Sequence, residues 1–165
     1  MDLDSALEGK PAEGASATDI LRADHREVER LFTQYEDADG DAQSRLVLMR
    51  TLCMQLELHD RVEREVFYPA AVHVMPDAVA AAAQEHDELM QIVNGLRERS
   101  TCDRDCDEAI ANLRTLVDRH VHVEETELFP RFEKQSADLC ALGQQLVSYK
   151  ETATRSTESF EGPAT

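Results

Sequence analysis

Apolar residues recur every three or four positions along most of this chain, which is the spacing of one face of an α-helix. No segment shows the strict alternation that a half-buried strand requires. The pattern, together with capping, loop and proline residues, predicts four long helices at about 18–37, 42–68, 76–99 and 105–129. Because short connections join these helices, the predicted fold class is all-α: an up-down-up-down four-helix bundle.

The segments outside the long helices complete the predicted domain organisation. Thr18 or Asp19 is expected to cap the first helix, and Pro69 and Pro130 are expected to mark the ends of the second and the fourth. Ser136 is expected to cap a short additional C-terminal helix. The predicted organisation is a flexible leader at 1–16, the bundle at 17–134, the C-terminal helix at 135–152 and a disordered tail at 153–165.

The two halves of the predicted bundle repeat each other at an offset of 61 residues. The stretch HDRVEREVFYP at 59–69 matches HVHVEETELFP at 120–130, so both read H-x3-E-x4-[FY]-P. The same offset relates His25 to His86 in the preceding helices. We therefore predict two related helical hairpins packed about a pseudo-twofold axis.

The repeated polar residues fall on the apolar faces of the helices. Residues three or four positions apart share a face, so the inward face of the second helix carries Leu52, Leu56, His59, Glu63 and Val66. The other three helices have faces of the same kind, each interrupted only by the repeated histidines and glutamates. The side chains expected to converge inside the bundle are His25, His59, Glu63, His86, His120 and Glu124.

This convergence predicts a metal site. A lone histidine on an apolar face is usually a satisfied core residue, but six polar groups in one core have a different meaning. Two buried carboxylates without compensating cations would each cost several kcal/mol, and a pair of bound metal ions removes that cost. Imidazole and carboxylate ligands suit iron, manganese or zinc. The i, i+4 spacing lets His59 and Glu63 reach one centre together, and the same holds for His120 and Glu124.

With these residues the sequence resembles the hemerythrin-like, HHE cation-binding family. The resemblance covers about 18–134 and rests on the order H…HxxxE…H…HxxxE, the DH and EH pairs ending at His25 and His86, and the YP and FP endings. It implies a four-helix bundle around a non-haem di-iron centre, with two irons joined by an oxo or hydroxo group and bridged by Glu63 and Glu124. The ligands that the resemblance implies are His25, His59, Glu63, His86, His120 and Glu124.

One position departs from the oxygen-carrying members of that family. Those proteins place a fifth histidine one turn after the first on the third helix, where this chain has Met90. The chain is similar to the variant with four histidines and two carboxylates, found in proteins that repair iron–sulfur clusters and in bacterial proteins linked to nitric oxide or peroxide. The leader has no cysteine, unlike the N-terminal domain typical of the repair proteins. Five ligands per iron would leave one octahedral position open on each metal.

Composition and charge narrow the function further. The formal net charge of −17 disfavours nucleic acid and anionic membranes as partners, since both require basic patches. No apolar run approaches the roughly 20 residues that span a bilayer, and the acidic N-terminus has no secretory signal, so a cytoplasmic protein is expected. The expected function is binding of dioxygen, nitric oxide or peroxide in oxygen or stress handling. A catalase-like di-iron enzyme, and iron storage or donation including cluster repair, are the alternatives.

The remaining candidate residues are expected to be ordinary. His73 and His122 lie outside the repeat and are predicted to be at the surface, and Glu125 and Glu127 are assigned to solvent. Met90 is expected to fill the core. The cysteines are too scattered for a disulfide framework, and only one pair is close, with a C-x3-C spacing that is a weak zinc signal. They are expected to be reduced, with a redox role for the close pair as the alternative: Cys53, Cys102, Cys106 and Cys140.

Overall fold

The computed structural model describes residues 14–38, 40–136 and 138–158. Most of the predicted leader and the end of the predicted tail lie outside these ranges. Within them the chain is helical, and its elements are α1 (Ala17–Asp37), α2 (Ala42–Val62), η2 (Glu63–Phe67), α3 (Tyr68–Ala71), α4 (Pro76–Arg97), α5 (Arg104–Val123), η3 (Glu124–Leu128), α6 (Phe129–Gln135) and α7 (Leu139–Glu158). No helix of the described part is long and apolar enough to cross a membrane.

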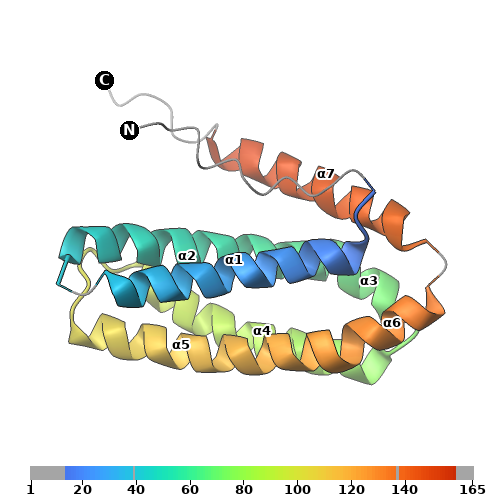
Figure 1. Ribbon diagram of the computed structural model, residues 1–165, viewed down its shortest axis with the longest axis horizontal. Helices are drawn as coiled ribbons and strands as arrows, with labels where there is room; N and C mark the ends of the chain where they lie inside the picture. Colours follow the sequence, from blue (N-terminus) through green and yellow to red (C-terminus); the bar gives the residue numbers. More distant parts are fainter. Residues whose placement is uncertain (1–13, 39, 137, 159–165) are drawn as a thin grey trace.

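The long helices form the predicted up-down-up-down bundle. Helices α1 and α2 pack as one antiparallel hairpin, α4 and α5 pack as the other, and α2 contacts α4 between them (Figure 1). The short elements η2, α3, η3 and α6 prolong α2 and α5 at one end of the bundle. Helix α7 lies across α1 and the α2–η2 junction. The all-α bundle with an additional C-terminal helix is therefore confirmed.

Side-chain caps set the starts of α1, α2 and α5 at or within one residue of the predicted positions. Ser16 caps α1 in a capping box with Asp19, so the predicted caps at Thr18 and Asp19 are wrong. Asp41 and Asp103 cap α2 and α5 by accepting backbone N–H bonds. The predicted cap Ser136 instead follows the end of α6. Helix α7 begins at 139 and runs to 158, so the part of the predicted tail at 153–158 is helical.

Pro69 and Pro130 do not end their helices, which corrects the prediction. Each proline follows a π-helical turn, η2 or η3, and occupies the second position of the next helix. The turn is wider because the Tyr68 N–H donates to the carbonyl of Glu63, five residues back, and the Phe129 N–H donates to that of Glu124. A proline near a helix start loses no hydrogen bond, so the chain continues to Ala71 and Gln135.

The π turns also change which side chains face inward. Each adds a residue to the turn, which rotates the following side chains relative to a regular helix. Val66, predicted to face the core, is only partly buried, whereas Phe67 and Tyr68 are buried. Leu128 and Phe129 are their counterparts in the second half, and both are buried.

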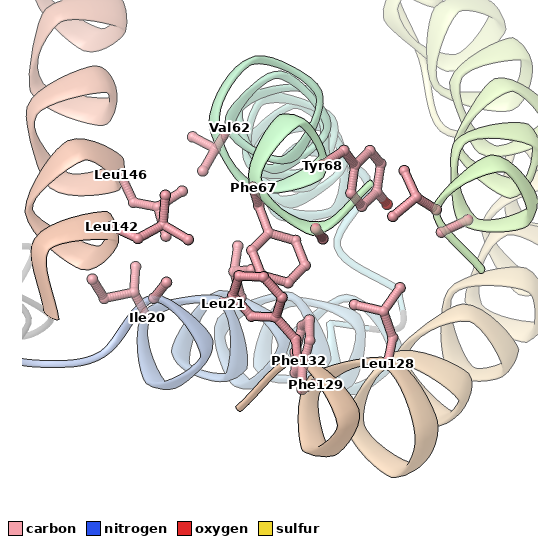
Figure 2. Packing of buried hydrophobic residues seen from close by; sticks show 14 of the residues in the cluster. Ile20, Leu21, Val62, Phe67, Tyr68, Leu128, Phe129, Phe132, Leu142 and Leu146 are labelled. Carbon is pink, nitrogen blue, oxygen red and sulfur yellow. The ribbon is translucent and has the colours of Figure 1, made fainter. Parts of the chain in front are cut away.

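Two apolar clusters fill the bundle on either side of the polar residues. One contains Phe67, Phe129 and Phe132 together with Leu142 and Leu146 of α7 (Figure 2). The other occupies the opposite part of the bundle, among α1, α2, α4 and α5. The bundle core is therefore apolar at both ends, which leaves the middle as the place where buried polar groups meet.

Helix α7 approaches the start of α1 very closely at Gly143. A β-carbon there would lie 2.3 Å from the carbonyl oxygen of Ala15, closer than two such atoms can pack. The glycine therefore lets the two backbones meet, and α7 covers the apolar cluster that supports the π turns.

Candidate metal centre

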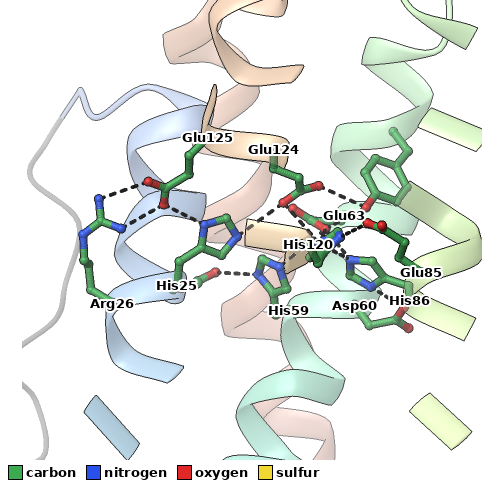
Figure 3. A network of polar contacts seen from close by, with 12 residues as sticks. His25, Arg26, His59, Asp60, Glu63, Glu85, His86, His120, Glu124 and Glu125 are labelled. Carbon is green, nitrogen blue, oxygen red and sulfur yellow. Dashed lines mark hydrogen bonds and ion pairs between the residues drawn. The ribbon is translucent and has the colours of Figure 1, made fainter. Parts of the chain in front are cut away.

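The six predicted site residues meet inside the bundle, and each comes from the expected element. His25 lies on α1, His59 on α2, His86 on α4 and His120 on α5. The two glutamates, Glu63 and Glu124, are the first residues of the π turns η2 and η3. None of the six is more than 5% exposed. Figure 3 shows their side chains directed toward one another.

Their ligand atoms form two adjacent groups, each suited to one cation. The atoms of each group lie within 4.8 Å of one another. The first group is His59, Glu63, His86 and His120; the second is His25, His59, Glu63 and Glu124. Because His59 and Glu63 belong to both groups, the two cation positions would be neighbours. Structure and prediction agree on which residues converge, and their role as ligands stays a prediction.

Several inward-facing atoms have no hydrogen-bond partner. They are His25 Nε2, His59 Nε2, Glu63 Oε1 and Glu124 Oε2. Buried polar atoms are normally satisfied, because leaving one unpaired costs about 1–3 kcal/mol and more for a charged group. Their polar neighbours are other atoms of the cluster, since His25 Nε2 lies 3.4 Å from Glu124 Oε2 and His59 Nε2 lies 3.4 Å from Glu63 Oε2. Imidazole nitrogens and carboxylate oxygens that converge in this way are ligand types that a divalent cation accepts. The donor set therefore fits a pair of bound metal ions.

Each histidine presents its other ring nitrogen, Nδ1, to a carboxylate outside the cluster. The four pairs are His25 with Glu125 at 2.9 Å, His86 with Asp60 at 2.8 Å, His120 with Glu85 at 3.0 Å, and His59 with Asp24 at 3.8 Å (Figure 3). A proton held on Nδ1 leaves the Nε2 lone pair directed at the centre, which is the orientation that a metal-binding histidine needs.

The four outer carboxylates are in turn paired with cations. Burial alone would raise the pKa of Asp60, but its hydrogen bonds with His86 and Arg64 outweigh burial and lower it. Burial also opposes the effects of His59 and Lys150 on Asp24, and these two partners outweigh it and lower the pKa of Asp24. The full set of pairs is Asp24 with Lys150, Asp60 with Arg64, Glu85 with Arg119, and Glu125 with Arg26. These carboxylates therefore stay ionised and able to accept from the histidines.

The outer carboxylates break the repeat that relates the two halves. Arg26 pairs with Glu125, and the residues 61 positions away, Asp87 and Arg64, form the same pair with the charges exchanged. Because an arginine occupies the place of Glu125, it cannot accept from His86, and Asp60 of α2 does so instead. The assignment of Glu125 to solvent was therefore wrong. Its half-burial follows from the π turn, which rotates it toward α1.

Tyr68 connects the two glutamates. Its hydroxyl donates to Glu63 Oε2 at 2.9 Å and lies 3.2 Å from Glu124 Oε1. Burial, followed by the charges of both glutamates, raises the pKa of Tyr68, so the phenol keeps its proton. Its counterpart in the second half is Phe129, which has no hydroxyl. The YP and FP endings of the repeat thus differ in one hydroxyl group. The Tyr68 hydroxyl lies on the side of the cluster where the two glutamates are.

The glutamates draw positive charge to the histidines. Burial by itself lowers the pKa of His120, but Glu124 and Glu85 outweigh it and raise the pKa to about 10. The pKa values of His25 and His86 are raised for the same reason, with burial opposing their carboxylate partners. The negative charge of the cluster therefore favours the binding of cations, either protons or metal ions.

A small apolar cavity adjoins the histidines. Its volume is about 10 Å³, close to the space that one water-sized molecule needs. The four site histidines contribute its polar atoms, and the rest of the lining is Val28, Leu56, Leu89, Met90, Val117 and Val121. Met90 and Val121 are only partly buried, so the cavity approaches the surface beside them.

The candidate residues outside the six lie in different environments. His73 and His122 are not buried in the bundle, and His122 is exposed, in keeping with their assignment to the surface. Glu127 is exposed as well, as predicted. Met90, expected to pack beside the site as filler, lines the cavity next to the four histidines and is partly buried. Sequence reasoning missed Asp60, whose only signal was its place beside His59.

Fold and cluster together define a metal-binding helical bundle, and comparison with known proteins gives the family. The sequence pattern of the hemerythrin HHE cation binding domain matches residues 16–132. The chain therefore belongs to the hemerythrin HHE cation-binding family.

Similar proteins occur in mycobacteria. Uncharacterized protein Rv2633c of Mycobacterium tuberculosis and uncharacterized protein Mb2666c of Mycobacterium bovis are each 24% identical over 115 residues, covering 70% of this chain and 71% of theirs. A crystal structure of a hemerythrin HHE cation binding domain-containing protein from Mycobacterium kansasii, a homologue of Rv2633c, matches with a TM-score of 0.73. That match has 22% identity and covers 86% of this chain and 91% of the other, so it supports the fold.

Proposed function

We propose that this protein holds two non-haem irons in the His–Glu cluster and binds a small ligand beside them: dioxygen, nitric oxide or peroxide. The observation that carries the proposal is the apolar cavity of about 10 Å³ against the four histidines. A space for about one water-sized molecule suits a very small ligand and excludes an organic substrate. The role that follows is oxygen handling or protection against oxidative or nitrosative stress.

Iron is the metal that the donors and the family favour. Imidazole and carboxylate ligands are shared by iron, manganese and zinc, so the donor set alone leaves the metal open. Membership of the hemerythrin family favours two irons joined by an oxo or hydroxo group. When bound, such a pair supplies reversible redox chemistry and an open coordination position. Glu63 and Glu124, which both contact the Tyr68 hydroxyl, are the residues we assign to bridge it.

The protein's own groups would act on the two sides of this centre. On the cavity side, Val28, Leu89 and Val117 exclude water and ions and admit small neutral molecules. On the opposite side, the Tyr68 hydroxyl holds the two glutamates in place with a proton that it does not release. Nδ1 protons held by the outer carboxylates keep the histidines oriented.

A catalase-like activity and iron storage or donation would use the same cluster. Among the residues that line the cavity, the histidines are the only ones with polar side chains, so no separate acid or base faces a ligand there. Binding therefore needs fewer groups than an elaborate reaction does. Peroxide turnover needs little beyond the metals, and we treat it as an outcome that the experiment below would reveal.

The test uses iron-loaded, reduced protein mixed in turn with dioxygen, nitric oxide and peroxide. Reversible spectral adducts are expected. Val117→Phe fills the cavity and should weaken these adducts while iron content is kept, whereas Val123→Phe, at an exposed position, should leave them unchanged. If Val117→Phe lowers iron content, Val117→Leu gives the milder comparison. Equal ligand affinity in all variants would contradict the assignment of the cavity, and sustained oxygen evolution from peroxide would establish an enzyme instead.

A further inference from the structure

A second cluster of metal-binding atoms lies outside the His–Glu centre, among the residues of the other apolar cluster. Three sulfur atoms converge there: Met49 Sδ from α2, Cys106 Sγ from the first turn of α5, and Cys102 Sγ from the segment just before it. Cys106 Sγ lies 3.3 Å from Cys102 Sγ and 3.5 Å from Met49 Sδ. Cys102 Sγ lies 3.9 Å from Met49 Sδ.

The three sulfurs form a nearly regular triangle close to the size that a metal ion requires. A point equidistant from corners separated by 3.3, 3.5 and 3.9 Å lies about 2.1 Å from each. Thiolate sulfur binds zinc at about 2.3 Å, which places three sulfurs in one plane with the ion about 4.0 Å apart, so the closest pair would have to separate by about 0.7 Å. Side chains that merely fill a core have no reason to direct three sulfurs at one point.

The ligand types select a soft, monovalent ion. Thiolates together with a thioether favour Cu(I), whereas zinc sites use four thiolate, imidazole or carboxylate ligands. Within the described ranges, the two groups of His, Cys, Asp and Glu that could hold a metal both belong to the His–Glu centre, so no histidine or carboxylate completes a zinc site here. We propose that Cys102, Cys106 and Met49 form a three-coordinate site for Cu(I) or an ion of the same softness.

The surroundings of the triangle suit a bound soft cation. Met49 and Cys106 are fully buried, whereas Cys102 is half-buried and gives an ion a route from the surface. The Tyr35 hydroxyl donates to Asp107, and its oxygen lies 3.5 Å from Cys106 Sγ. Because an apolar cluster surrounds the remaining faces, water would not compete as a ligand.

Binding is a proton exchange, not a redox step. One Cu(I) ion and two thiols give a dithiolate complex that keeps the thioether, and two protons leave to solvent. Burial raises the pKa of Cys106 to about 11, although the Tyr35 hydroxyl and Arg99 oppose this, so in the absence of an ion the thiol is protonated at neutral pH. Affinity for Cu(I) should therefore increase as the pH rises.

The close pair of thiols also allows a disulfide, which is the alternative use of these two cysteines. An oxidant such as peroxide would take two electrons and the two thiol protons from Cys102 and Cys106, form the S–S bond and leave water. That reaction needs both cysteines and does not involve Met49. Met49 is therefore the residue that separates the two possibilities.

The experiment titrates Cu(I) into the reduced full chain under anaerobic conditions, with the His–Glu centre already loaded with iron and a chromogenic Cu(I) chelator as competitor. One equivalent of Cu(I) is expected, with X-ray absorption showing three sulfur neighbours. Met49→Leu conserves volume and Cys106→Ala removes a thiol. Both should weaken binding by at least about tenfold, since even residues that only orient a metal ligand contribute that much.

Cys140→Ser is the matched control, because Cys140 is exposed and bonds the carbonyl of Gly14, away from the three sulfurs. It should bind Cu(I) as the unmodified chain does. The proposal would be overturned if the chelator kept all the Cu(I), or if Met49→Leu bound it as tightly as the unmodified chain. Unchanged iron content throughout shows that the result is independent of the His–Glu centre and of the function proposed for it.

Discussion

Replacing Tyr68 by phenylalanine tests whether its hydroxyl positions the two buried glutamates. The change removes one oxygen atom and keeps the ring in its packing site. The hydroxyl lies 2.9 Å from Glu63 Oε2 and 3.2 Å from Glu124 Oε1, but a phenol has only one proton to donate. The two contacts therefore share one hydrogen bond to a charged acceptor, which contributes about 1.5–3 kcal/mol.

The expected loss depends on whether metal is bound. For a chain of this size, 1 kcal/mol corresponds to roughly 2–4 °C in Tm, so the metal-free Tyr68→Phe variant should melt about 5–10 °C lower. Bound metal ions would hold the same carboxylates, so the metal-loaded variant should lose less. Metal affinity should fall by about tenfold, as it does when groups that orient ligands are removed. Calorimetric melting of both forms, with metal analysis after competition with a chelator, gives all three quantities.

Tyr35→Phe is the control for this prediction. Tyr35 is the other buried tyrosine with a carboxylate acceptor, since its hydroxyl donates to Asp107 at 2.8 Å, away from the His–Glu cluster. Removing the Tyr35 hydroxyl should lower Tm equally in the metal-free and metal-loaded forms and leave the metal affinity of the His–Glu cluster unchanged. The reasoning fails if Tyr68→Phe shows that same equal loss, or if its metal-free form melts within about 2 °C of the unmodified chain, less than 1 kcal/mol.

Three further predictions address the outer carboxylates, the histidines and α7. Glu125→Gln should lower metal affinity by about 10–100-fold, because the carboxylate orients His25, whereas exposed Glu127→Gln should change nothing in the same chelator competition. Metal affinity should rise with pH from neutrality toward the pKa of His120, about 10, because a proton held by the folded protein must leave before metal binds; a flat affinity between about pH 7 and 9 would contradict this. Gly143→Ala should destabilise the fold by about 1–3 kcal/mol in denaturant unfolding, since its β-carbon would meet Ala15. Gly95→Ala, with open space around it, should stabilise by about 0.5–1 kcal/mol, and equal effects at the two glycines would refute the close approach of α7.

The ligands of the His–Glu centre could be predicted from the sequence, whereas those of the proposed copper site could not. The ligands of the centre recur at a fixed offset, with His59 and Glu63 repeated as His120 and Glu124, so their pattern could be recognised without the structure. Met49 lies more than fifty positions from the cysteines and follows no repeat. Only the packing of α2 against the first turn of α5 brings their sulfurs together.

The helices, the duplicated hairpin and the six residues that converge in the core could all be predicted from the chain without its fold. All of these depend on local periodicity, because side chains three or four positions apart share a helix face whatever the rest of the fold does. The rule that proline ends a helix misled the prediction at Pro69 and Pro130, because in each case a π turn lets the helical chain continue past the proline.

The tertiary structure alone decided how the site is supported. Glu125 contacts His25 from a distant part of the chain. The equivalent position in the first half is Arg64, which cannot accept from His86, so Asp60 accepts from His86 instead. The size of the cavity and the position of the Tyr68 hydroxyl between two glutamates likewise depend on how the helices are placed relative to one another. Contacts between distant elements are set by packing distances and rotations of whole helices, and no spacing along one helix encodes them.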